Sequence, residues 1–300
     1  MTDIDRSAAG TDDVVVGVDG SAASVTALRY AAAAAARFGG RLRVLHVLPE
    51  YVEFGYPIAV AEVTGPGDAV LRTVLEEAGP IDESITVTTA MRRGPIGAAL
   101  VSYARAARLL VVGADRRNVA ARILTGNVST NVAASSAAPV VVVPESWRGT
   151  DRHGVVLAGV KGRAHADAVI AAAFDVAQEQ EARLVILHAW KLPSGYDDVI
   201  VGRVADEAWD ERARSELGAL VAAGSATRPG IEVTLHVVHD QAAHALVEAS
   251  SKADEVILVR RAHGIPAATH LGATARAVLR ESVAPVRIVP PGAGSALPTS

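Results

Sequence analysis

The stretch LLVVGADRRNVAARILTGNVSTNVAASSAAPVVVVP, residues 109–144, decides the fold of this chain. An apolar run at 109–112 is followed by Gly113, by an arginine-rich loop that extends to Gly126, and later by a second apolar run at 140–143. Short runs of β-branched residues bounded by turn residues are typical of buried parallel strands, and the small polar residues near Gly126 are typical of a helix start. The stretch therefore predicts a strand, a glycine loop, a helix and a strand.

The glycine loop allows two interpretations. A helix that begins beyond it would present unpaired N–H groups and the positive end of its dipole, a combination that binds phosphate. Glycine at positions 113 and 126 would let the backbone approach an anion closely. A glycine after a strand also occurs in any doubly wound α/β protein. By itself, the loop is therefore better explained as a structural feature of the fold than as a phosphate-binding site.

Composition restricts the class of protein. Three hundred residues suggest two domains of about 150 residues each, and a chain that is 50% apolar but only 4% aromatic must build its core from Val, Leu, Ile and Ala. A formal net charge of −4 does not favour a nucleic-acid partner. The absence of cysteine excludes disulfides and thiol chemistry. We see no secretory signal and no membrane-spanning run, so we expect a cytoplasmic protein without membrane contact.

The first half alternates predicted strands with predicted helices. The segment 49–67 is rich in Pro, Gly and aromatic residues, and we expect it to be a functional or mobile loop. Alternation of this kind predicts a parallel sheet with helices on both faces. The predicted strands are 14–18, 41–47, 85–91, 109–112 and 140–143, and the predicted helices are 22–38, 68–78, 94–107 and the segment from Gly126 to before Pro139.

The second half of the chain repeats the first. A shift of 142 places VVVGVDGS (14–21) on VLAGVKGR (156–163), and a shift of 146 further along places Leu100 on Leu246. The repeat predicts two tandem domains of one fold. We expect the first domain at 13–144, a linker at 145–153, the second domain at 154–290 and a flexible tail at 291–300.

The two copies differ in the glycine loop. A purely architectural glycine has no reason to be missing from one copy only, so the difference favours a ligand in the first copy. The residues Gly113, Arg116, Asn127 and Ser129 of the first copy become Val259, Ala262, Ala273 and Ala275 in the second.

Four segments, taken together, resemble the universal stress protein family in its tandem-domain form. They are VVVGVDGS (14–21), LRVLHV (42–47), RRGPIGAAL (92–100) and the loop 113–129. The resemblance implies two open five-stranded parallel sheets in the order 3-2-1-4-5, the adenine-nucleotide α-hydrolase-like fold. In this order Asp19 and Gly113 follow adjacent strands and face one crevice, at the carboxyl ends where such sheets bind ligands.

The resemblance also implies a nucleotide site. In ATP-binding members an aspartate contacts adenosine, and a Gly-x2-Gly-x9-Gly-Ser/Thr loop holds ribose and phosphates. Gly113 and Gly126 match the first and third glycines of that loop, whereas Arg116 replaces the second. The implied nucleotide-binding residues are Asp19, Val47 at the adenine pocket, Gly113, Arg116, Gly126, Asn127 in place of Ser/Thr, Val128 and Ser129.

Arg116 leaves three alternatives open. Its guanidinium could contact a phosphate, for which its planar fork of donors is suited. It could instead pair with Asp115 or Asp19 and fill an empty site, or it could be solvated. Together with Arg105, Arg108 and the other loop arginines, it is expected to bring positive charge to the crevice.

The resemblance implies a stress-response regulator that binds ATP, with or without Mg²⁺, in its first domain. The sequence contains no Walker lysine and no Gly-x-Ser-x-Gly motif. We therefore expect no dedicated catalysis beyond slow incidental ATP hydrolysis. Two alternatives are a nucleotide-free interaction scaffold and a binder of AMP or cyclic AMP.

The second copy has Lys161 at the position of Asp19, so we expect it to bind no ATP. We expect it to pair with the first copy through the edge strands Val140–Val143 and Val286–Val289. A homodimer and an unidentified regulatory protein are further expected partners.

Two groups of histidines favour structural roles. His46 and His188 are repeat equivalents at the end of the second strand, so a role in the scaffold is expected for both. The spacing of His236, His239 and His244 suggests a metal site, but without a carboxylate motif it favours surface or packing residues.

Overall fold

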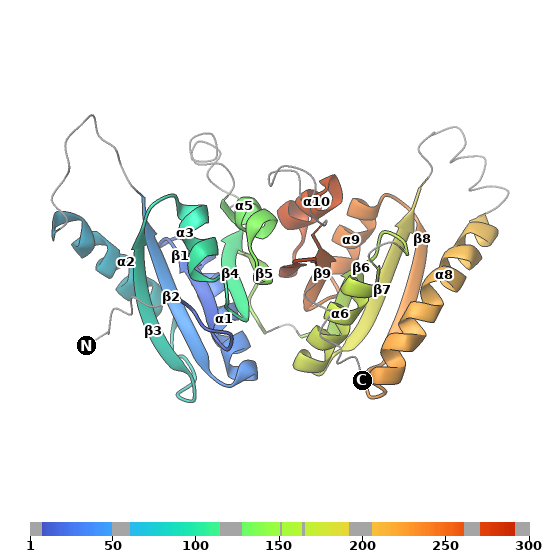
Figure 1. Cartoon of the computed structure of the whole chain (residues 1–300), viewed down its shortest axis with the longest axis horizontal. Coiled ribbons are helices and arrows are strands. Elements are labelled where there is room, and N and C mark those ends of the chain that lie inside the picture. The colour runs from blue at the N-terminus through green and yellow to red at the C-terminus, as the bar shows by residue number, and fades with distance from the viewer. Residues whose placement is uncertain are drawn as a thin grey trace. The chain divides into compact units, whose positions relative to one another are not determined.

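The structure is a computed structural model that describes residues 8–49, 61–114, 128–150, 152–163, 166–191, 206–260 and 271–291; for 61–66 and 206–207 it describes the backbone alone. The chain divides into two compact units between Gly149 and Thr150. Each unit is an open parallel sheet flanked by helices, which confirms the predicted fold class (Figure 1).

Within its described residues, the first unit alternates five strands with four helices. The strands run parallel in the order β3-β2-β1-β4-β5, so β1 is central and has β2 and β4 as neighbours. The elements are β1 (Val14–Val18), α1 (Ala22–Phe38), β2 (Arg41–Leu48), α2 (Ala61–Ala78), β3 (Thr86–Arg93), α3 (Ile96–Tyr103), β4 (Leu109–Ala114), α5 (Val128–Ser135) and β5 (Val140–Pro144).

The second unit has the same strand order in its described part, β8-β7-β6-β9-β10, again with parallel pairs. Its elements are β6 (Val155–Gly159), α6 (Ala166–Gln180), β7 (Arg183–Trp190), α8 (Asp206–Thr227), β8 (Val233–His239), α9 (Ala242–Ser250), β9 (Glu255–Val259), α10 (Ala273–Glu281) and β10 (Val286–Val289).

The strand register confirms the internal repeat. Val14 is the partner of Leu109 in the first sheet, and Val156 is the partner of Glu255 in the second. Positions 14 and 156 differ by 142, and positions 109 and 255 differ by 146, which are the two shifts found in the sequence. Equivalent residues of the two copies can therefore be compared directly.

Local sequence signals set the ends of α1. The hydroxyl of Ser21 accepts a hydrogen bond from the Ser24 N–H at 3.2 Å and so caps the first turn. Gly39 follows the last turn with φ 96°, a left-handed conformation that glycine adopts without the steric cost that a Cβ would bring. The helix predicted at 22–38 is confirmed at both ends.

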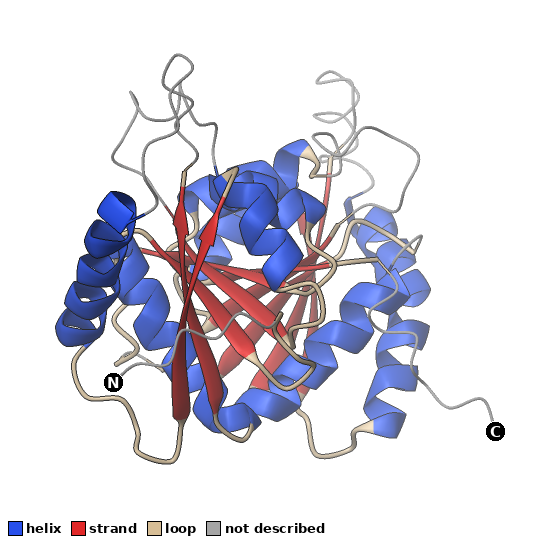
Figure 2. Cartoon of the chain, turned by 60° about the vertical axis from the view of Figure 1, so that its left-hand side comes forward, coloured by secondary structure: helices blue, strands red, loops and turns tan. Residues whose placement is uncertain are grey.

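Helices lie on both sides of the strands (Figure 2). Alternate residues of β1 point to opposite faces of the sheet. Val14, Val16 and Val18 belong to the core cluster that also contains the apolar face of α1. Gly17 faces the other side, where a Cβ would lie 2.7 Å from Cδ2 of Leu100 in α3. Because Gly17 lacks a side chain, α3 can pack directly on the strand.

Several predicted boundaries were wrong, including that of the strand predicted at 85–91, which is β3 and ends at Arg93. Helix α2 begins at Ala61 rather than 68, so residues 61–67 of the expected loop are helical although they include Gly65, Pro66 and Gly67; residues 50–60 lie outside the described part. The helix predicted at 94–107 ends at Tyr103. Gly113 belongs to β4, which continues to Ala114, rather than to a turn.

Candidate functional site

Asp19 lies at the carboxyl end of β1, directly after Val18, and is exposed. Its Oδ1 accepts hydrogen bonds from the Ser21 backbone N–H at 3.0 Å and from the Ser21 hydroxyl at 2.6 Å. Two donors thus fix the orientation of the carboxylate. Its Oδ2 has no hydrogen-bond partner among the described residues, so one oxygen is available to accept a bond from a ligand.

Gly113 lies at the same edge of the sheet, in the neighbouring strand β4. Val16 pairs with Val111, and continuing this register by two residues places Gly113 beside Val18. A Cβ at Gly113 would lie 2.6 Å from the Ala23 carbonyl oxygen in the first turn of α1. The sequence comparison favoured a ligand as the reason for this glycine. The structure shows that packing also requires it, because the absence of a side chain lets α1 approach β4. In the second unit the equivalent of Ala23 is His165, which lies outside the described residues.

Val47 and His46 both lie near the end of β2. Val47 is 5% exposed. The Nδ1 of His46 bonds to the Val18 carbonyl oxygen at 2.7 Å, and in the second unit the Nδ1 of His188 bonds to the Val160 carbonyl at 3.0 Å. Because a carbonyl can only accept, Nδ1 carries the proton in both. The same bond in both copies supports the structural role expected for these histidines.

Only part of the predicted loop site lies within the described residues. Val128 opens α5 and is half-buried, and Ser129 in its first turn is 9% exposed. Ser129 has a partner within the chain. Arg116, Gly126 and Asn127 lie outside the described residues. The structure thus places Asp19, Val47 and Gly113 along the ends of adjacent strands, with α5 following β4.

We expected several arginines at this edge of the sheet, and the expectation is wrong for Arg108 and Arg105. Arg108 directly precedes β4 and lies over the Phe38 ring, with 4.1 Å from Cζ to the ring centroid, at the opposite, amino edge of the sheet. Arg105 also precedes β4, in the turn after α3. Residues that precede a strand lie at its start, so both side chains are a strand length away from the carboxyl edge.

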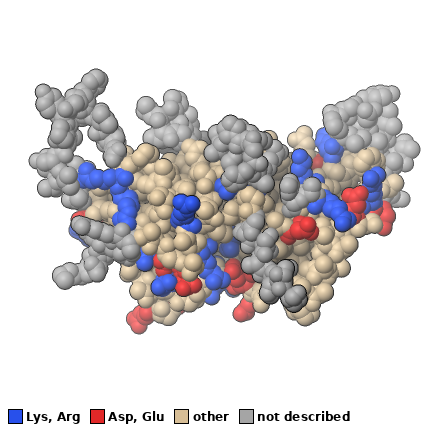
Figure 3. Space-filling view, viewed as in Figure 1, with Lys and Arg blue, Asp and Glu red and all other residues tan. Residues whose placement is uncertain are grey.

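Sequence reasoning missed two arginines that do lie at the carboxyl edge. Arg92 and Arg93 end β3, and Figure 3 shows Lys and Arg side chains gathered at the upper left, over this part of the first unit. Arg92 lies over the Tyr103 ring at 4.8 Å, and its Nη1 donates to the Met91 carbonyl at 2.9 Å. The signal was visible in the sequence, since both arginines directly follow the predicted strand 85–91.

The carboxyl edge of the second unit has a different chemistry. Lys161 and Arg163 follow β6 where Asp19 and Ser21 follow β1, and both are exposed. Arg260 follows β9 and is 7% exposed, and burial lowers the pKa of its guanidinium. The negative charge of the first unit at this point is therefore replaced by positive charge.

The three histidines with metal-like spacing do not form one group. His236 and His239 lie on β8, where they point to opposite faces of the sheet because three positions separate them. His244 lies on α9 and bonds to Asp240 at 2.6 Å. No group of three or more potential ligands within the described part of the chain is placed to hold a metal ion.

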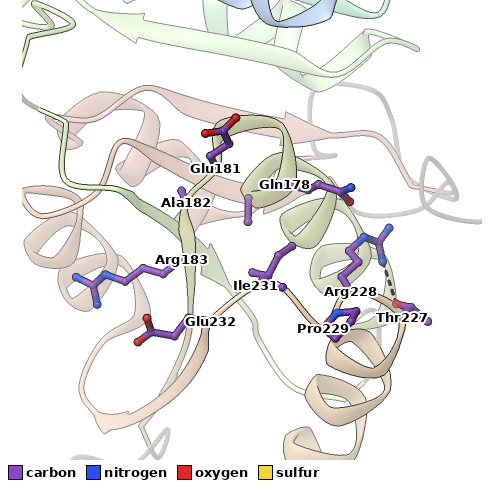
Figure 4. A pocket seen from close by; sticks show the side chains of 11 residues that line it. Gln178, Glu181, Ala182, Arg183, Thr227, Arg228, Pro229, Ile231 and Glu232 are labelled. Carbon is purple, nitrogen blue, oxygen red and sulfur yellow. Dashed lines mark hydrogen bonds between the residues drawn. The ribbon is translucent and has the colours of Figure 1, made fainter.

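A hollow of ≈ 590 Å³ lies at the opposite, amino edge of the second unit, between the ends of α6 and α8 and the start of β7 (Figure 4). Arg228 at its rim forms an ion pair with Asp175. Glu181 has φ 51°, whereas the equivalent residue of the first unit is Gly39. Because the hollow lies away from the carboxyl ends of the strands, it is separate from the edge described above.

Among the described residues, no helix combines the length and the apolar character that crossing a bilayer requires.

The strand order and the repeated register define a tandem protein of the doubly wound α/β class. The sequence pattern of the universal stress protein family matches the chain twice, over residues 10–144 and 153–290. The chain therefore belongs to the universal stress protein family and contains two copies of its domain.

Relatives with known sequences and structures agree with this assignment. A universal stress protein of Mycolicibacterium smegmatis is 27% identical over 294 residues, which cover 93% of this chain and 97% of the relative. One of Mycobacterium tuberculosis is 28% identical over 283 residues, covering 91% and 95%. The crystal structure of a universal stress protein from Archaeoglobus fulgidus has the same fold, with a TM-score of 0.67 at 20% identity over 93% of this chain and 96% of that one.

Proposed function

We propose that the first unit binds an adenine nucleotide, ATP in preference to AMP or cyclic AMP, at the carboxyl edge between β1 and β4. The proposal rests on the position and the hydrogen bonding of the Asp19 carboxylate. Its carboxylate is exposed, is held by two bonds from Ser21 through Oδ1, and has no partner at Oδ2 among the described residues. It follows the central strand, at the point where the direction of strand connection reverses and where such sheets bind ligands.

The surroundings of Asp19 suit a ligand that is polar at one end and anionic at the other. The carboxylate can accept hydrogen bonds from the hydroxyl or amine groups of an adenosine moiety. Arg92 and Arg93 at the end of β3 bring positive charge to the same edge. The residues that would hold phosphates by family resemblance, Gly126 and Asn127, lie outside the described part of the chain.

The protein acts by binding rather than by catalysis in this proposal. Its sequence lacks the lysine motif and the nucleophile motif that would activate a phosphate or an acyl group. A nucleotide would then act by shifting the population of conformations that a regulatory partner recognises. The second unit, with Lys161 in place of the aspartate, would serve as scaffold and bind no ATP.

Calorimetric titration of the full chain with ATP, AMP and cyclic AMP, with and without Mg²⁺, tests the proposal. Asp19→Asn is the sharpest variant, because the amide oxygen can still accept both Ser21 bonds while the charge is removed. Loss of a hydrogen bond to a charged group, about 1.5–3 kcal/mol, would weaken ATP binding roughly 10- to 150-fold.

Lys161→Ala is the matched control in the second unit and should leave ATP affinity unchanged. Equal ATP affinity in the wild type and Asp19→Asn would place the nucleotide elsewhere. If none of the three nucleotides binds while both variants keep wild-type stability, the protein is a nucleotide-free scaffold.

A further inference from the structure

A second hollow lies in the first unit, at the amino edge of its sheet. Its volume is ≈ 260 Å³, and it is bordered by the second half of α1, the end of α2 and the connection to β3. Its walls are mainly apolar and include Leu28, Ala32, Ala36, Ala78, Ile81 and Ile85. Arg29 and Asp82 bring charge to its lining. We call it the alanine hollow.

The second unit shows which side chain occupies the same place in the other copy. By the shift of 142, Phe174 stands at the position of Ala32, and its ring is fully buried. By the shift of 146, Gly224 of α8 stands at the position of Ala78, and a Cβ on this glycine would collide with Cε2 of Phe174. The glycine thus makes room for a phenyl ring between the two helices. The first unit has neither residue, and the alanine hollow lies between its helices at this place.

The charges at this place also differ between the copies. In the second unit the Arg228 guanidinium lies 5.8 Å from the centroid of the Phe174 ring and forms an ion pair with Asp175. The first unit has Asp82 and Ala33 at the equivalent positions. The second unit therefore supplies a ring and a cation from its own chain, and the equivalent positions of the first unit supply neither.

The charged groups of the alanine hollow leave a carboxylate for a ligand. The Arg29 guanidinium donates to the carbonyl oxygens of Glu77 at 2.6 Å and of Ala78 at 3.1 Å, so it is engaged by the end of α2. Asp82 is exposed, and its Oδ1 accepts a hydrogen bond from the Ser84 N–H at 2.9 Å. Hydrogen bonds from Ser84 lower the pKa of Asp82, so this carboxylate is ionised at neutral pH.

Acidic side chains predominate around Asp82. The exposed acidic residues at the end of α2 and after it are Glu76, Glu77, Asp82 and Glu83. Residues 73–85 contain no Lys or Arg. Arg37, the next cation along α1, lies over the Tyr30 ring at 6.0 Å. Arg72 of α2 lies six positions before Ala78, about 120° around the helix from it. The surroundings therefore favour a cationic ligand.

We propose that the alanine hollow binds an arylalkylamine, in which a short chain joins an aromatic ring to an ammonium group. The ring occupies the space that Phe174 fills in the second unit, and the ammonium group pairs with Asp82. An apolar cavity of about 150 Å³ is enough to bind benzene. The volume of ≈ 260 Å³ thus has room for a ring and a short chain. The site lies at the sheet edge opposite Asp19 and does not depend on the nucleotide proposal.

NMR titration of the full chain with four probes tests this inference. The probe 2-phenylethylamine has both the ring and the cation, and 2-phenylethanol has the ring without charge. The other two are 3-phenylpropionate, which has the ring with the opposite charge, and propylamine, which has the cation without the ring. We expect 2-phenylethylamine to bind more tightly than the other three and to shift the amide signals of Ala32 and Ala78.

Variants of the lining test where the probe binds. The double variant Ala32→Phe/Ala78→Gly copies the second unit and should abolish the binding of 2-phenylethylamine, because the new ring fills the hollow. Asp82→Asn keeps an acceptor for Ser84 and should weaken binding roughly 2- to 5-fold, the range for one exposed ion pair. Asp68→Asn is the matched control at an exposed carboxylate near the start of α2, and it should leave binding unchanged.

Ala36→Arg tests the same site if the double variant does not fold. Position 36 is exposed in the last turn of α1, where a cation is compatible with the helix, and the new charge opposes a cationic ligand. The inference is wrong if 2-phenylethylamine does not bind, if 2-phenylethanol binds as tightly, or if the shifted signals belong to the second unit. It is also wrong if Ala36→Arg, or the folded double variant, binds the amine as the wild type does.

Discussion

The first unit has Leu109 at the start of β4 and Val141 in β5, both buried, whereas the second unit has Glu255 and Arg287 at the equivalent positions. The Arg287 Nε bonds to Glu255 Oε1 at 2.5 Å, and Gln180 of α6 also donates to Glu255. A sheet of the same register thus accepts either an apolar pair or an ion pair here.

The first unit has its own buried ion pair at a different place. Arg43 of β2 bonds to Asp13 at 2.6 Å, and Asp13 is 1% exposed. The second unit has Val155 and Val185 at these positions. Both copies therefore contain a buried carboxylate paired with an arginine, but at different positions. The comparison shows that the fold tolerates a buried ion pair at either position, provided that both partners are present.

The largest expected effect on stability is that of Glu255→Leu, which disrupts the buried ion pair of the second unit. It introduces the residue of the first unit but leaves the Arg287 guanidinium buried without its main carboxylate, so we expect a loss of about 3–5 kcal/mol in the free energy of unfolding. Urea denaturation measures this loss.

The double variant Glu255→Leu/Arg287→Val is the control, because it reproduces both residues of the first unit. We expect it to recover part of the lost stability, because no buried guanidinium is left without its main carboxylate, while Gln180 and Glu179 still lose their partners. A double variant as unstable as the single one would show that the second unit depends on this ion pair.

Gly113→Val places the residue of the second unit in the first. Its side chain would meet the backbone of Ala23, where even a Cβ comes within 2.6 Å of the carbonyl oxygen. We expect a loss of about 3 kcal/mol from overpacking against α1. The reciprocal change Val259→Gly should cost less. If urea denaturation shows that Gly113→Val is as stable as the wild type, packing does not require this glycine. A role in ligand binding alone would then explain it.

His46→Phe and His188→Phe test the feature that both units share. Each change keeps a ring but leaves a strand carbonyl without its donor, so we expect a loss of about 2 kcal/mol for each. ATP affinity should be the same in His46→Phe as in the wild type. A selective loss of ATP binding in this variant would instead make His46 a nucleotide contact.

The smallest expected effect is a pH dependence confined to the second unit. The hydrogen bond to Asp240 raises the pKa of His244 from its ordinary value of 6.5, and the same bond lowers the pKa of Asp240 from 3.8. Stabilisation by His244 is complete below pH 6.5 and is lost as pH rises through its raised pKa. Stabilisation by Asp240 is present above pH 3.8 and is lost as pH falls through its lowered pKa.

The first unit lacks this pair, since Gly94 and Ala98 occupy the equivalent positions. Titration of the His244 ring by NMR should therefore give a midpoint above 6.5, and Asp240→Asn should bring it down. An unchanged midpoint in Asp240→Asn would show that the ion pair does not form in solution.

The fold could be predicted because buried parallel strands carry a local signal. Val14–Val18 and the other central strands are short apolar runs, and the internal repeat gave the second unit by comparison with the first. Helix α2 was placed too late because Gly65, Pro66 and Gly67 oppose helix formation locally. The structure nevertheless continues α2 through these residues.

The candidate site could be predicted only in part. The place of Asp19 and Gly113 at one sheet edge follows from strand order, which the family resemblance supplied. Contacts between distant residues had no local signal: Phe174 and Gly224 are separated by 50 positions, and Glu255 and Arg287 by 32. The close approach of α1 to Gly113 is likewise set by packing rather than by a motif.

The central claim is that one unit binds an adenine nucleotide and the other does not. The most direct measurement is to denature freshly purified protein and to quantify any released nucleotide per chain by mass spectrometry. We predict about one adenine nucleotide per wild-type chain, and much less from Asp19→Asn prepared in the same way. Two nucleotides per chain, or equal amounts from the wild type and Asp19→Asn, would contradict the account.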